Sequence, residues 1–185
     1  ITAHARSVKL IADTVSDEPW VAVVDDGAGM HEAELIEAMR LGSKNPTDER
    51  ETKDLGRFGL GLKSASFSQC RSLTVLTRQE GQTSCARWNL DRVAKRNDWS
   101  LELIDNPEQV TGYDLMPETG TVIIWEHLDR LNGGYYNNLA KRAEYMNAEL
   151  SRAEYHLRLV FHRFLEGSKP QLELSLNGRP LKPGD

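Results

Sequence analysis

A buried strand that runs into a glycine-rich turn constrains the fold of this chain most strongly. Residues Trp20–Val24 are a continuous apolar, β-prone run, and Asp25-Asp26-Gly27-Ala28-Gly29-Met30 follows at once. Such a short apolar run that halts at a turn is typical of a strand covered on both faces. The two glycines allow a backbone that bulkier residues could not follow and leave room for a flat ligand. The carboxylate of Asp25 could accept a hydrogen bond from an exocyclic amine, or the segment could be a tight turn with solvated aspartates.

A second glycine cluster opens a predicted helix at Leu60–Phe67. Its sequence is Gly56-Arg57-Phe58-Gly59-Leu60-Gly61-Leu62-Lys63-Ser64. Glycines at this density expose backbone N–H groups beside the positive end of a helix dipole, which suits phosphate, and Lys63 adds a mobile cation. The cluster is not a Walker P-loop, because Leu62 separates glycine from lysine. It is not Rossmann-like either, because a polar loop rather than a strand precedes it.

Strands and helices alternate along the rest of the chain, which predicts an α/β fold. Residues Gly42–Gly56 are polar and long for an internal loop, so they indicate a functional lid or a disordered segment. Leu172–Leu176 before Asn177-Gly178 predicts a hairpin. The remaining predicted strands are Ser7–Ala12, Leu73–Thr77, Ser84–Leu90 and Thr121–Trp125, the predicted helices are Glu32–Leu41 and Asn138–Leu165, and Asp105–Gly120 is predicted to be a loop.

Charge and composition narrow the function classes. The net charge of −5 gives no general attraction to nucleic acid or anionic membrane, and the basic residues of the long C-terminal helix are mixed with glutamates. No run reaches the roughly 18 apolar residues of a membrane span. Cys70 and Cys85 fit neither a metal motif nor a disulfide framework, and the five histidines are dispersed. We therefore expect a cytoplasmic protein with no membrane partner and no nucleic-acid surface on this domain.

The order of the two motifs resembles one known superfamily. A strand ending in D-x-G-x-G-M, a helix, a polar loop and then G-x-x-G-x-G-L-x-S resembles the ATP-binding domain of the gyrase, heat-shock chaperone, histidine kinase and MutL (GHKL, or Bergerat-fold) ATPases, from Ser7 to about Trp125. Within it, Gly42-Ser43-Lys44, the string GLGLKSAS and the segment HLRLVFHRFL most resemble microrchidia-like and chaperone-like members. The resemblance implies a two-layer α/β sandwich: a mixed, mainly antiparallel sheet with helices on one face.

The resemblance also implies a nucleotide site. Asp25 would receive the adenine amino group, Gly27 and Gly29 would shape the pocket, and Met30 would lie against the ring. Thr121 matches a later threonine whose hydroxyl helps to fix the aspartate. Gly42–Gly56, with Ser43 and Lys44, would be the lid. The phosphate segment would comprise Gly56, Arg57, Phe58, Gly59, Leu60, Gly61, Leu62 and Lys63, with the amides of Gly59 to Lys63 holding the phosphates.

One departure concerns the superfamily's first motif, which carries a general-base glutamate and a magnesium-binding asparagine. The opening Ile1-Thr2-Ala3 resembles only the tail of that motif. We therefore expect both groups upstream of residue 1, and no catalytic or metal-binding residue within this chain. The expected domains are an ATP-binding domain over residues 1–168 without the start of its first helix, and over residues 169–185 the start of a following domain or a C-terminal hairpin.

Two function classes follow for the parent protein, with ATP and Mg²⁺ as the implied cofactors. The first is an ATPase in which nucleotide closes the lid and drives homodimerisation, although the fragment alone would be inactive. The alternative is a nucleotide-gated protein-interaction module with little or no hydrolysis.

Overall fold

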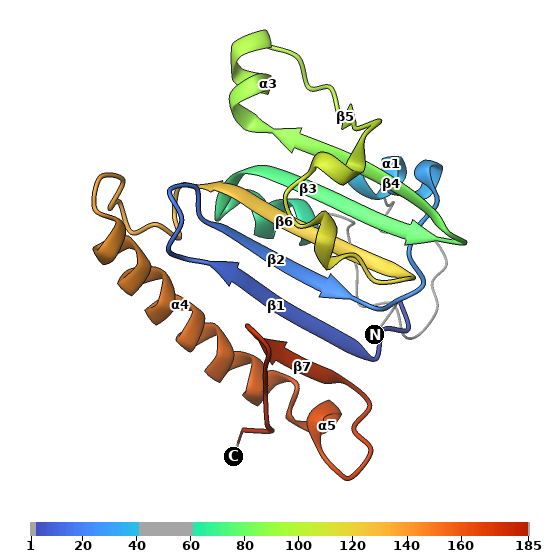
Figure 1. Cartoon of the computed structure of the whole chain (residues 1–185), viewed down its shortest axis with the longest axis vertical. Helices are drawn as coiled ribbons and strands as arrows, with labels where there is room; N and C mark the ends of the chain where they lie inside the picture. The colour runs from blue at the N-terminus through green and yellow to red at the C-terminus, as the bar shows by residue number, and fades with distance from the viewer. Residues whose placement is uncertain (1–2, 41–60, 185) are drawn as a thin grey trace.

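One mixed sheet runs through the whole molecule. The computed structural model describes residues 3–40 and 61–184. Its eight strands lie in the order β5-β4-β3-β6-β2-β1-β7-β8. All strand pairs are antiparallel except β1 with β7 (Figure 1). The strands are β1 (Ser7–Asp13), β2 (Trp20–Asp25), β3 (Cys70–Gln79), β4 (Gln82–Asn89), β5 (Glu102–Leu103), β6 (Gly120–Leu128), β7 (Glu173–Leu176) and β8 (Arg179–Pro180).

The strand predicted from the apolar run, β2, lies inside the sheet between β1 and β6. Val21, Ala22 and Val24 are all buried, as expected for a strand that is covered on both faces. The mixed, mainly antiparallel α/β sheet implied by the resemblance is confirmed. The helices are α1 (Glu32–Met39), α2 (Gly61–Phe67), α3 (Leu90–Arg96), α4 (Leu139–Val160) and α5 (His162–Leu165), with short 3₁₀ turns η1 (Pro107–Gln109) and η2 (Tyr113–Leu115).

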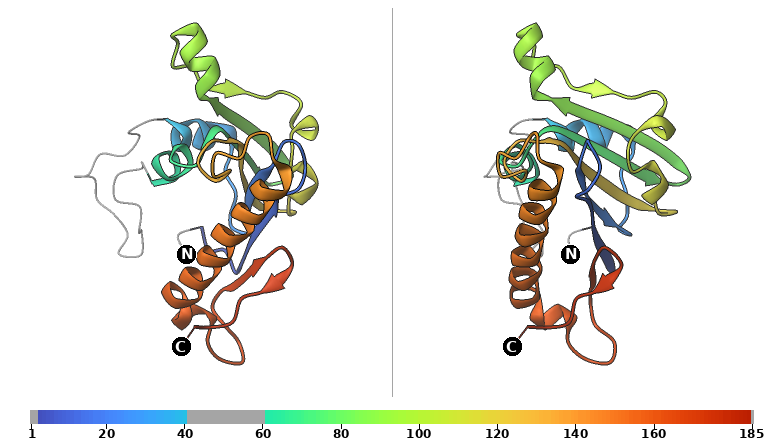
Figure 2. Two further views of the ribbon diagram at one scale, coloured as in Figure 1. Left: turned by 90° about the vertical axis from the view of Figure 1, so that its left-hand side faces the viewer. Right: turned by 60° about the vertical axis from the view of Figure 1, so that its left-hand side comes forward.

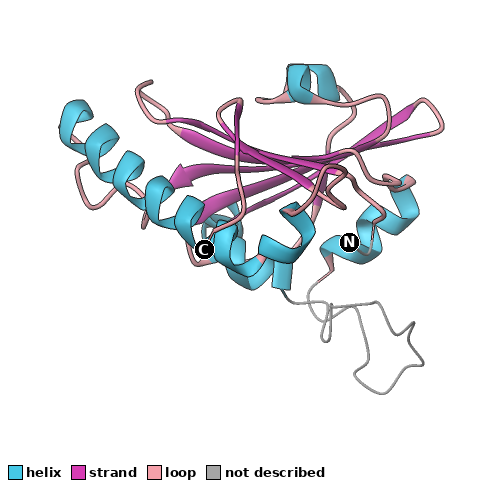
Figure 3. Cartoon of the chain, turned by 90° about the horizontal axis from the view of Figure 1, so that it is seen from below, coloured by secondary structure: helices cyan, strands magenta, loops and turns pink. Residues whose placement is uncertain are grey.

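The main helices cover one face of the sheet in two groups (Figures 2 and 3). Helices α1 and α2 pack over β3, β4 and β6 through a cluster that includes Leu35, Met39 and Leu73. Helices α4 and α5 pack over β1 and β7, where Leu150 and Leu165 meet the leucines of the C-terminal hairpin. The C-terminal end of β2 lies between these two groups, because its partners are β1 on one side and β6 on the other.

The opposite face is covered by the segment that the sequence predicted to be a plain loop. This prediction was incomplete, because residues 105–120 contain η1 and η2 and bury Val110 against the sheet. Ile124 and Leu76 line the sheet side of that second core. Helix α3 was not predicted either. The strand predicted as Ser84–Leu90 ends at Asn89, whose side chain accepts a hydrogen bond from Arg92 N and caps α3.

The C-terminal hairpin belongs to the same sheet as the nucleotide-motif strands. Strand β7 pairs in parallel with β1, with Val8 opposite Leu174, and β8 turns back on β7 at Asn177-Gly178. Residues 169–185 therefore contain the hairpin that the sequence indicated. Whether a further domain begins there stays a prediction.

Candidate functional site

Three strand ends bring the predicted adenine-site residues together on the helix-covered face. Asp25 is the last residue of β2, Thr121 is the second residue of β6, and Thr77 lies near the end of β3. In the sheet register Asp25 is opposite Thr121, and Thr121 is opposite Thr77. Because directly opposite residues share a face, the three side chains form a row across the sheet. The sequence paired Asp25 with Thr121 and missed Thr77.

Asp25 is only partly exposed, and its carboxylate is held by its own turn. Oδ1 accepts a hydrogen bond from Gly27 N at 2.9 Å. Burial raises the pKa of Asp25 above its ordinary value; the Gly27 hydrogen bond opposes this shift, and the charge of Asp26 adds to it. Carboxyl groups whose pKa is raised by burial are frequent at sites where a carboxylate binds a ligand.

The neighbouring Asp26 has a different position and role. Its exposed carboxylate accepts hydrogen bonds from Arg6 N and Ser7 N, both at 2.8 Å. These bonds fix the chain as it enters β1. Of the two consecutive aspartates, Asp26 organises backbone, and Asp25 is the one that lies in the row with Thr77 and Thr121.

The glycines of the first motif have a structural explanation within the chain. Gly29 has φ +69°, and a Cβ there would lie 2.1 Å from the carbonyl oxygen of Arg78. A Cβ at Gly27 would lie 2.7 Å from the carbonyl oxygen of Ala3. The space that these glycines leave is thus used by backbone that packs against the turn. A contact of either glycine with a ligand stays a prediction.

Thr77 connects the first motif to the start of β6. It is fully buried, and its Oγ1 accepts a hydrogen bond from Met30 N at 2.9 Å. The same oxygen lies 3.2 Å from Gly120 O and 3.4 Å from Thr121 Oγ1. One hydroxyl therefore links Met30, which the sequence placed beside the base, to Thr121. A threonine near the end of a predicted strand is too common a pattern for the sequence to have singled it out.

The prediction that Lys63 carries a mobile cation is wrong. The side chain is 2% exposed, and Nζ donates to Ala38 O at 2.8 Å and to Arg40 O at 2.7 Å. Helix α1 has no basic residue in its last turn, and the backbone of its C-cap residue Arg40 is extended, so its final carbonyls need donors from elsewhere. The ammonium group supplies them. A phosphate contact through the backbone amide of Lys63 stays a prediction.

Two tryptophans complete the attachment of these helices to the sheet. Trp88 Nε1 donates to Met39 O at 2.9 Å, so α1 is also held from β4. Trp125 Nε1 donates to Ser66 Oγ at 2.8 Å, which fixes α2 on β6. Both rings therefore serve packing.

Much of the predicted phosphate and lid segment lies outside the described residues. Gly61 and Leu62, at the start of α2, are described, and Leu62 packs against the cluster under α1. The predicted lid Gly42–Gly56 cannot be compared with the structure. The predicted site residues outside the described ranges are Ser43, Lys44, Gly56, Arg57, Phe58, Gly59 and Leu60.

Other chemistries find little support in residues 3–40 and 61–184. In these ranges no three histidine, cysteine, aspartate or glutamate side chains gather as a metal site. Mg²⁺ as a cofactor of the parent protein stays a prediction. Burial raises the pKa of Cys70 and of Cys85 to about 12, so neither thiol is ionised near neutral pH. None of the described helices is both long and apolar enough to span a bilayer.

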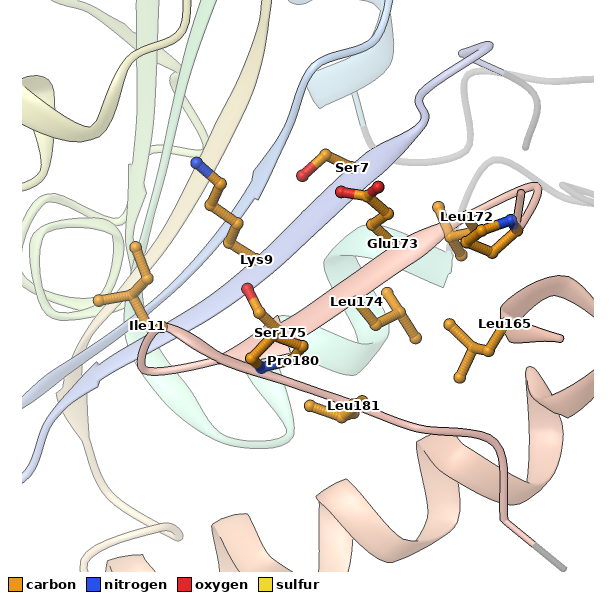
Figure 4. A pocket seen from close by; sticks show the side chains of 12 residues that line it. Ser7, Lys9, Ile11, Leu165, Leu172, Glu173, Leu174, Ser175, Pro180 and Leu181 are labelled. Atoms are coloured by element: carbon orange, nitrogen blue, oxygen red, sulfur yellow. The ribbon is translucent and has the colours of Figure 1, made fainter. Parts of the chain in front are cut away.

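A large cavity lies away from the predicted site residues. It has a volume of about 650 Å³ and lies between β1 and the β7–β8 hairpin (Figure 4). Leu165, Leu172 and Leu174 line it from one side, and polar side chains such as Lys9 line it from the other. Its leucines are already buried in the C-terminal core, so the cavity belongs to the packing of the hairpin.

Comparison with known sequences identifies the family. A sequence model of the family described as "Histidine kinase-, DNA gyrase B-, and HSP90-like ATPase" matches residues 1–117. The chain belongs to this family. The resemblance inferred from the two glycine motifs is thereby confirmed, and so is its coarse consequence, an ATP-binding ATPase domain. Thr121 lies just beyond the matched residues, so its assignment rests on its position opposite Asp25.

Three individual proteins that are similar in sequence to this chain carry different names. The chain is 30% identical over 79 residues to "ATPase morc-1" of Caenorhabditis elegans, which covers 43% of this chain and 9% of that protein. It is 30% identical over 131 residues to "Chaperone protein HtpG" of Francisella tularensis subsp. holarctica, or 64% and 19%. It is 31% identical over 120 residues to "Ribosomal RNA small subunit methyltransferase C" of Stutzerimonas stutzeri, or 60% and 33%.

These relatives include a microrchidia protein and a chaperone, the two groups that the motifs resemble most. The chain spans at most a third of the length of any of the three relatives. The activities of these whole proteins therefore do not follow for this chain.

Proposed function

We propose that this chain binds ATP through the row formed by Asp25, Thr77 and Thr121, with the adenine amino group on the Asp25 carboxylate. The observation that supports this most is the meeting of three strand ends at one partly buried acid, in a chain of this ATPase family. A carboxylate that is partly shielded from water loses solvation, and an amine donor restores a partner to it. Met30, held on Thr77, would lie beside the base.

The phosphates would extend from this row toward the start of α2. The proposal that the amides of Gly59 to Lys63 hold them rests on the sequence motif, and residues 42–56 would close over the nucleotide as a lid.

In the parent protein, closure of this lid would favour a homodimer. Light scattering with and without a non-hydrolysable ATP analogue tests that step, and an unchanged mass at saturating analogue would contradict it.

Hydrolysis is a separate proposal. ATP hydrolysis needs a positioned base, which contributes roughly 10²–10⁴-fold, and by the motif order Asp25 and Asp26 are at the adenine end. We therefore propose that the parent protein is an ATPase and that the 185-residue chain by itself turns over little or no ATP. The alternative function, a nucleotide-gated interaction module, shares the binding site but lacks turnover in the parent protein as well. Phosphate release by the parent protein distinguishes the two.

Binding is tested by calorimetry on Asp25→Asn with ATP. Loss of a charged acceptor should weaken binding by about 1.5–3 kcal/mol. Asp105→Asn is the matched control, because Asp105 is exposed on the segment that covers the other face of the sheet. Equal affinity in the wild type and Asp25→Asn would remove Asp25 from the adenine site.

A further inference from the structure

A second cavity lies at the ends of β2, β3 and β6 that are opposite to the proposed nucleotide site. Pro19 just before β2, Arg71 near the start of β3 and Leu128 at the end of β6 all line it, and Figure 1 shows these strands running from one end to the other. The cavity has a volume of about 330 Å³, at the lower end of the roughly 300–1,000 Å³ of ligand pockets. It is therefore separate from the nucleotide site and has room for a small molecule.

Arg142, which is 5% exposed, brings a buried positive charge to the wall of this cavity. Its Nη1 donates to Asp17 O at 3.1 Å and its Nη2 donates to Ser16 O, so both groups hold the turn between β1 and β2, whereas Nε is buried and has no hydrogen-bond partner. No carboxylate within residues 3–40 and 61–184 forms an ion pair with Arg142. Asp13 interacts with this charge at longer range, but its carboxylate is already bonded to amides of the same turn. The guanidinium thus lacks a paired counter-ion, which is costly for a buried charge.

Asp129 contributes an incompletely paired negative charge to the same cavity. Its Oδ1 is buried and has no hydrogen-bond partner, and its Oδ2 lies 3.8 Å from Arg71 Nη1, which is long for an ion pair. Arg71 pairs more closely with Asp91, with 2.6 Å between Nη2 and Oδ1. Of the described residues, only three have a buried side-chain polar atom without a partner, and two of these, Asp129 and Arg142, line this cavity. The cavity therefore lacks one hydrogen-bond donor and one acceptor.

The charges around the cavity favour a ligand that carries both signs. One water molecule takes about 30 Å³, so it would fill a small part of the cavity and would neutralise neither charge. An anion alone would meet the carboxylates of Asp17, Glu18 and Asp129, and a cation alone would meet Arg71 and Arg142. A zwitterion with a carboxylate and an ammonium group offers each unpaired charge an opposite partner.

The remaining wall of the cavity suits an apolar group. Pro19, Leu128 and Tyr136 line it, and Tyr136 is 65% exposed although most of its ring is apolar. An apolar side chain in the cavity would cover part of this ring and remove it from water, which is favourable.

We propose that this cavity binds a free α-amino acid with an apolar side chain, its carboxylate on the Arg142 guanidinium and its ammonium group on the Asp129 carboxylate. The two unpartnered atoms are buried, so the Asp129 carboxylate turns and the guanidinium shifts toward the cavity as the ligand enters. The inference goes beyond the proposed nucleotide binding and does not depend on it.

Calorimetry of L-leucine with the 185-residue chain tests the inference. N-acetyl-L-leucine lacks the ammonium group, and L-leucinamide lacks the carboxylate. We expect L-leucine to bind and each analogue to bind at least about tenfold more weakly, as for one lost hydrogen bond to a charged group. Asp25→Asn, at the proposed nucleotide site, should leave the affinity for L-leucine unchanged. A loss of L-leucine binding in that variant would place the amino acid elsewhere and overturn the inference.

Two variants separate ligand contact from folding. Asp129→Asn should weaken L-leucine binding about tenfold but leave N-acetyl-L-leucine binding unchanged, because that analogue has no ammonium group to lose. Arg142→Lys should weaken L-leucine binding and leave L-leucinamide binding unchanged. Damage to the fold would instead weaken every ligand alike, and Asp129→Asn carries the test if Arg142→Lys does not fold. Asp105→Asn, an exposed position, is the control and should change neither affinity.

The inference is overturned if neither L-leucine nor L-phenylalanine binds at millimolar concentrations. Equal affinities for L-leucine and N-acetyl-L-leucine, or equal losses of both in Asp129→Asn, overturn it as well. None of these results changes the conclusion on ATP, because nucleotide binding is measured separately through Asp25→Asn.

Discussion

The ionised carboxylate of Asp25 is needed for the proposed binding of adenine, but it lowers the stability of the nucleotide-free fold. Its pKa is raised in the folded protein, chiefly by burial, so the folded state binds a proton more readily than the unfolded state. The stabilisation from this group is therefore complete below the ordinary aspartate pKa of 3.8 and is lost as the pH rises through the raised value. At neutral pH the ionised Asp25 makes the nucleotide-free fold less stable.

It follows that Asp25→Asn should stabilise the nucleotide-free chain near neutral pH while it weakens ATP binding. The thermal midpoint of the variant should exceed that of the wild type at pH 7, and the difference should shrink as the pH approaches 4. Thermal scans between pH 3.5 and 7.5 measure this. A variant that is less stable than the wild type at pH 7 would mean that the ionised carboxylate is stabilised within the fold.

Gly29 is a position where a single added methyl group should destabilise the fold. Gly29→Ala combines a left-handed backbone with a clash against Arg78 O, whereas Gly81→Ala has a similar φ of +77° and open space around it. The control should cost about 1–2 kcal/mol for the backbone alone, and Gly29→Ala should cost clearly more. Urea denaturation of both variants gives the difference. Equal costs would show that the turn can move away from β3.

The sequence predicted single residues well where the chain itself defines their surroundings. Asp25 follows a buried strand within six residues of two glycines, so its place at a strand end was readable from the local pattern. The roles of Lys63 and Thr77 could not be predicted from the sequence. Their roles depend on Ala38, Arg40 and Gly120, which come from elements brought next to them only by the fold.

Helix α1 is held at its C-terminal end by side chains from other elements. Lys63 donates to Ala38 O in α1 and to the carbonyl of the C-cap residue Arg40. Trp88 donates to Met39 O, so α1 is tied to both α2 and β4. Helices of eight residues are marginal by themselves, so these donors matter for its persistence.

Lys63→Met should therefore loosen α1. Methionine keeps the length and apolar stem of lysine but leaves Ala38 O and Arg40 O without their donor, at a cost of about 1–3 kcal/mol. Amide hydrogen exchange in α1 should accelerate more than exchange in β3. Lys141→Met, on an exposed position of α4, is the matched control and should change neither. Unchanged protection of α1 in Lys63→Met would mean that water replaces the ammonium group.

Elements with a clear hydrophobic period were predicted, whereas α3, β5, η1 and η2 were not. Strand β2 matches its predicted run closely, and β6 extends beyond its predicted run to Leu128. The single helix predicted over Asn138–Leu165 is divided at Phe161 into α4 and α5. The turns η1 and η2 lie within the segment 105–120, whose prolines and glycines are typical of a loop. They are ordered by the second core, which Val110 enters from a distant part of the chain.

The last two strands, β7 and β8, form one edge of the sheet next to β1. The leucines of residues 172–181 form one cluster with Leu150 and Leu165, and β7 covers the edge of β1. Removal of residues 169–185 should expose that cluster and leave β1 as an open sheet edge.

We expect this truncation to lower the free energy of unfolding by several kcal/mol, since each buried leucine contributes about 1.5–3 kcal/mol, and to promote aggregation. Thermal unfolding and light scattering measure the two effects. Removal of residues 182–185 is the control: it deletes the hydrogen bonds of Arg158 with Lys182 and Gly184 but spares the cluster, so it should cost much less. A truncated chain as stable as the full one would make residues 1–168 an independent folding unit.

The parallel pairing of β1 with β7 also sets the order in which the chain can fold during synthesis. Val8 cannot reach Leu174 until more than 160 further residues have left the ribosome. At roughly 5–20 residues per second, β1 then waits on the order of ten seconds or more with one edge unpaired. The antiparallel core of β2, β3, β4 and β6 needs no residue beyond Leu128. It can form first, and closure of the longest loop in the molecule becomes a late event in folding.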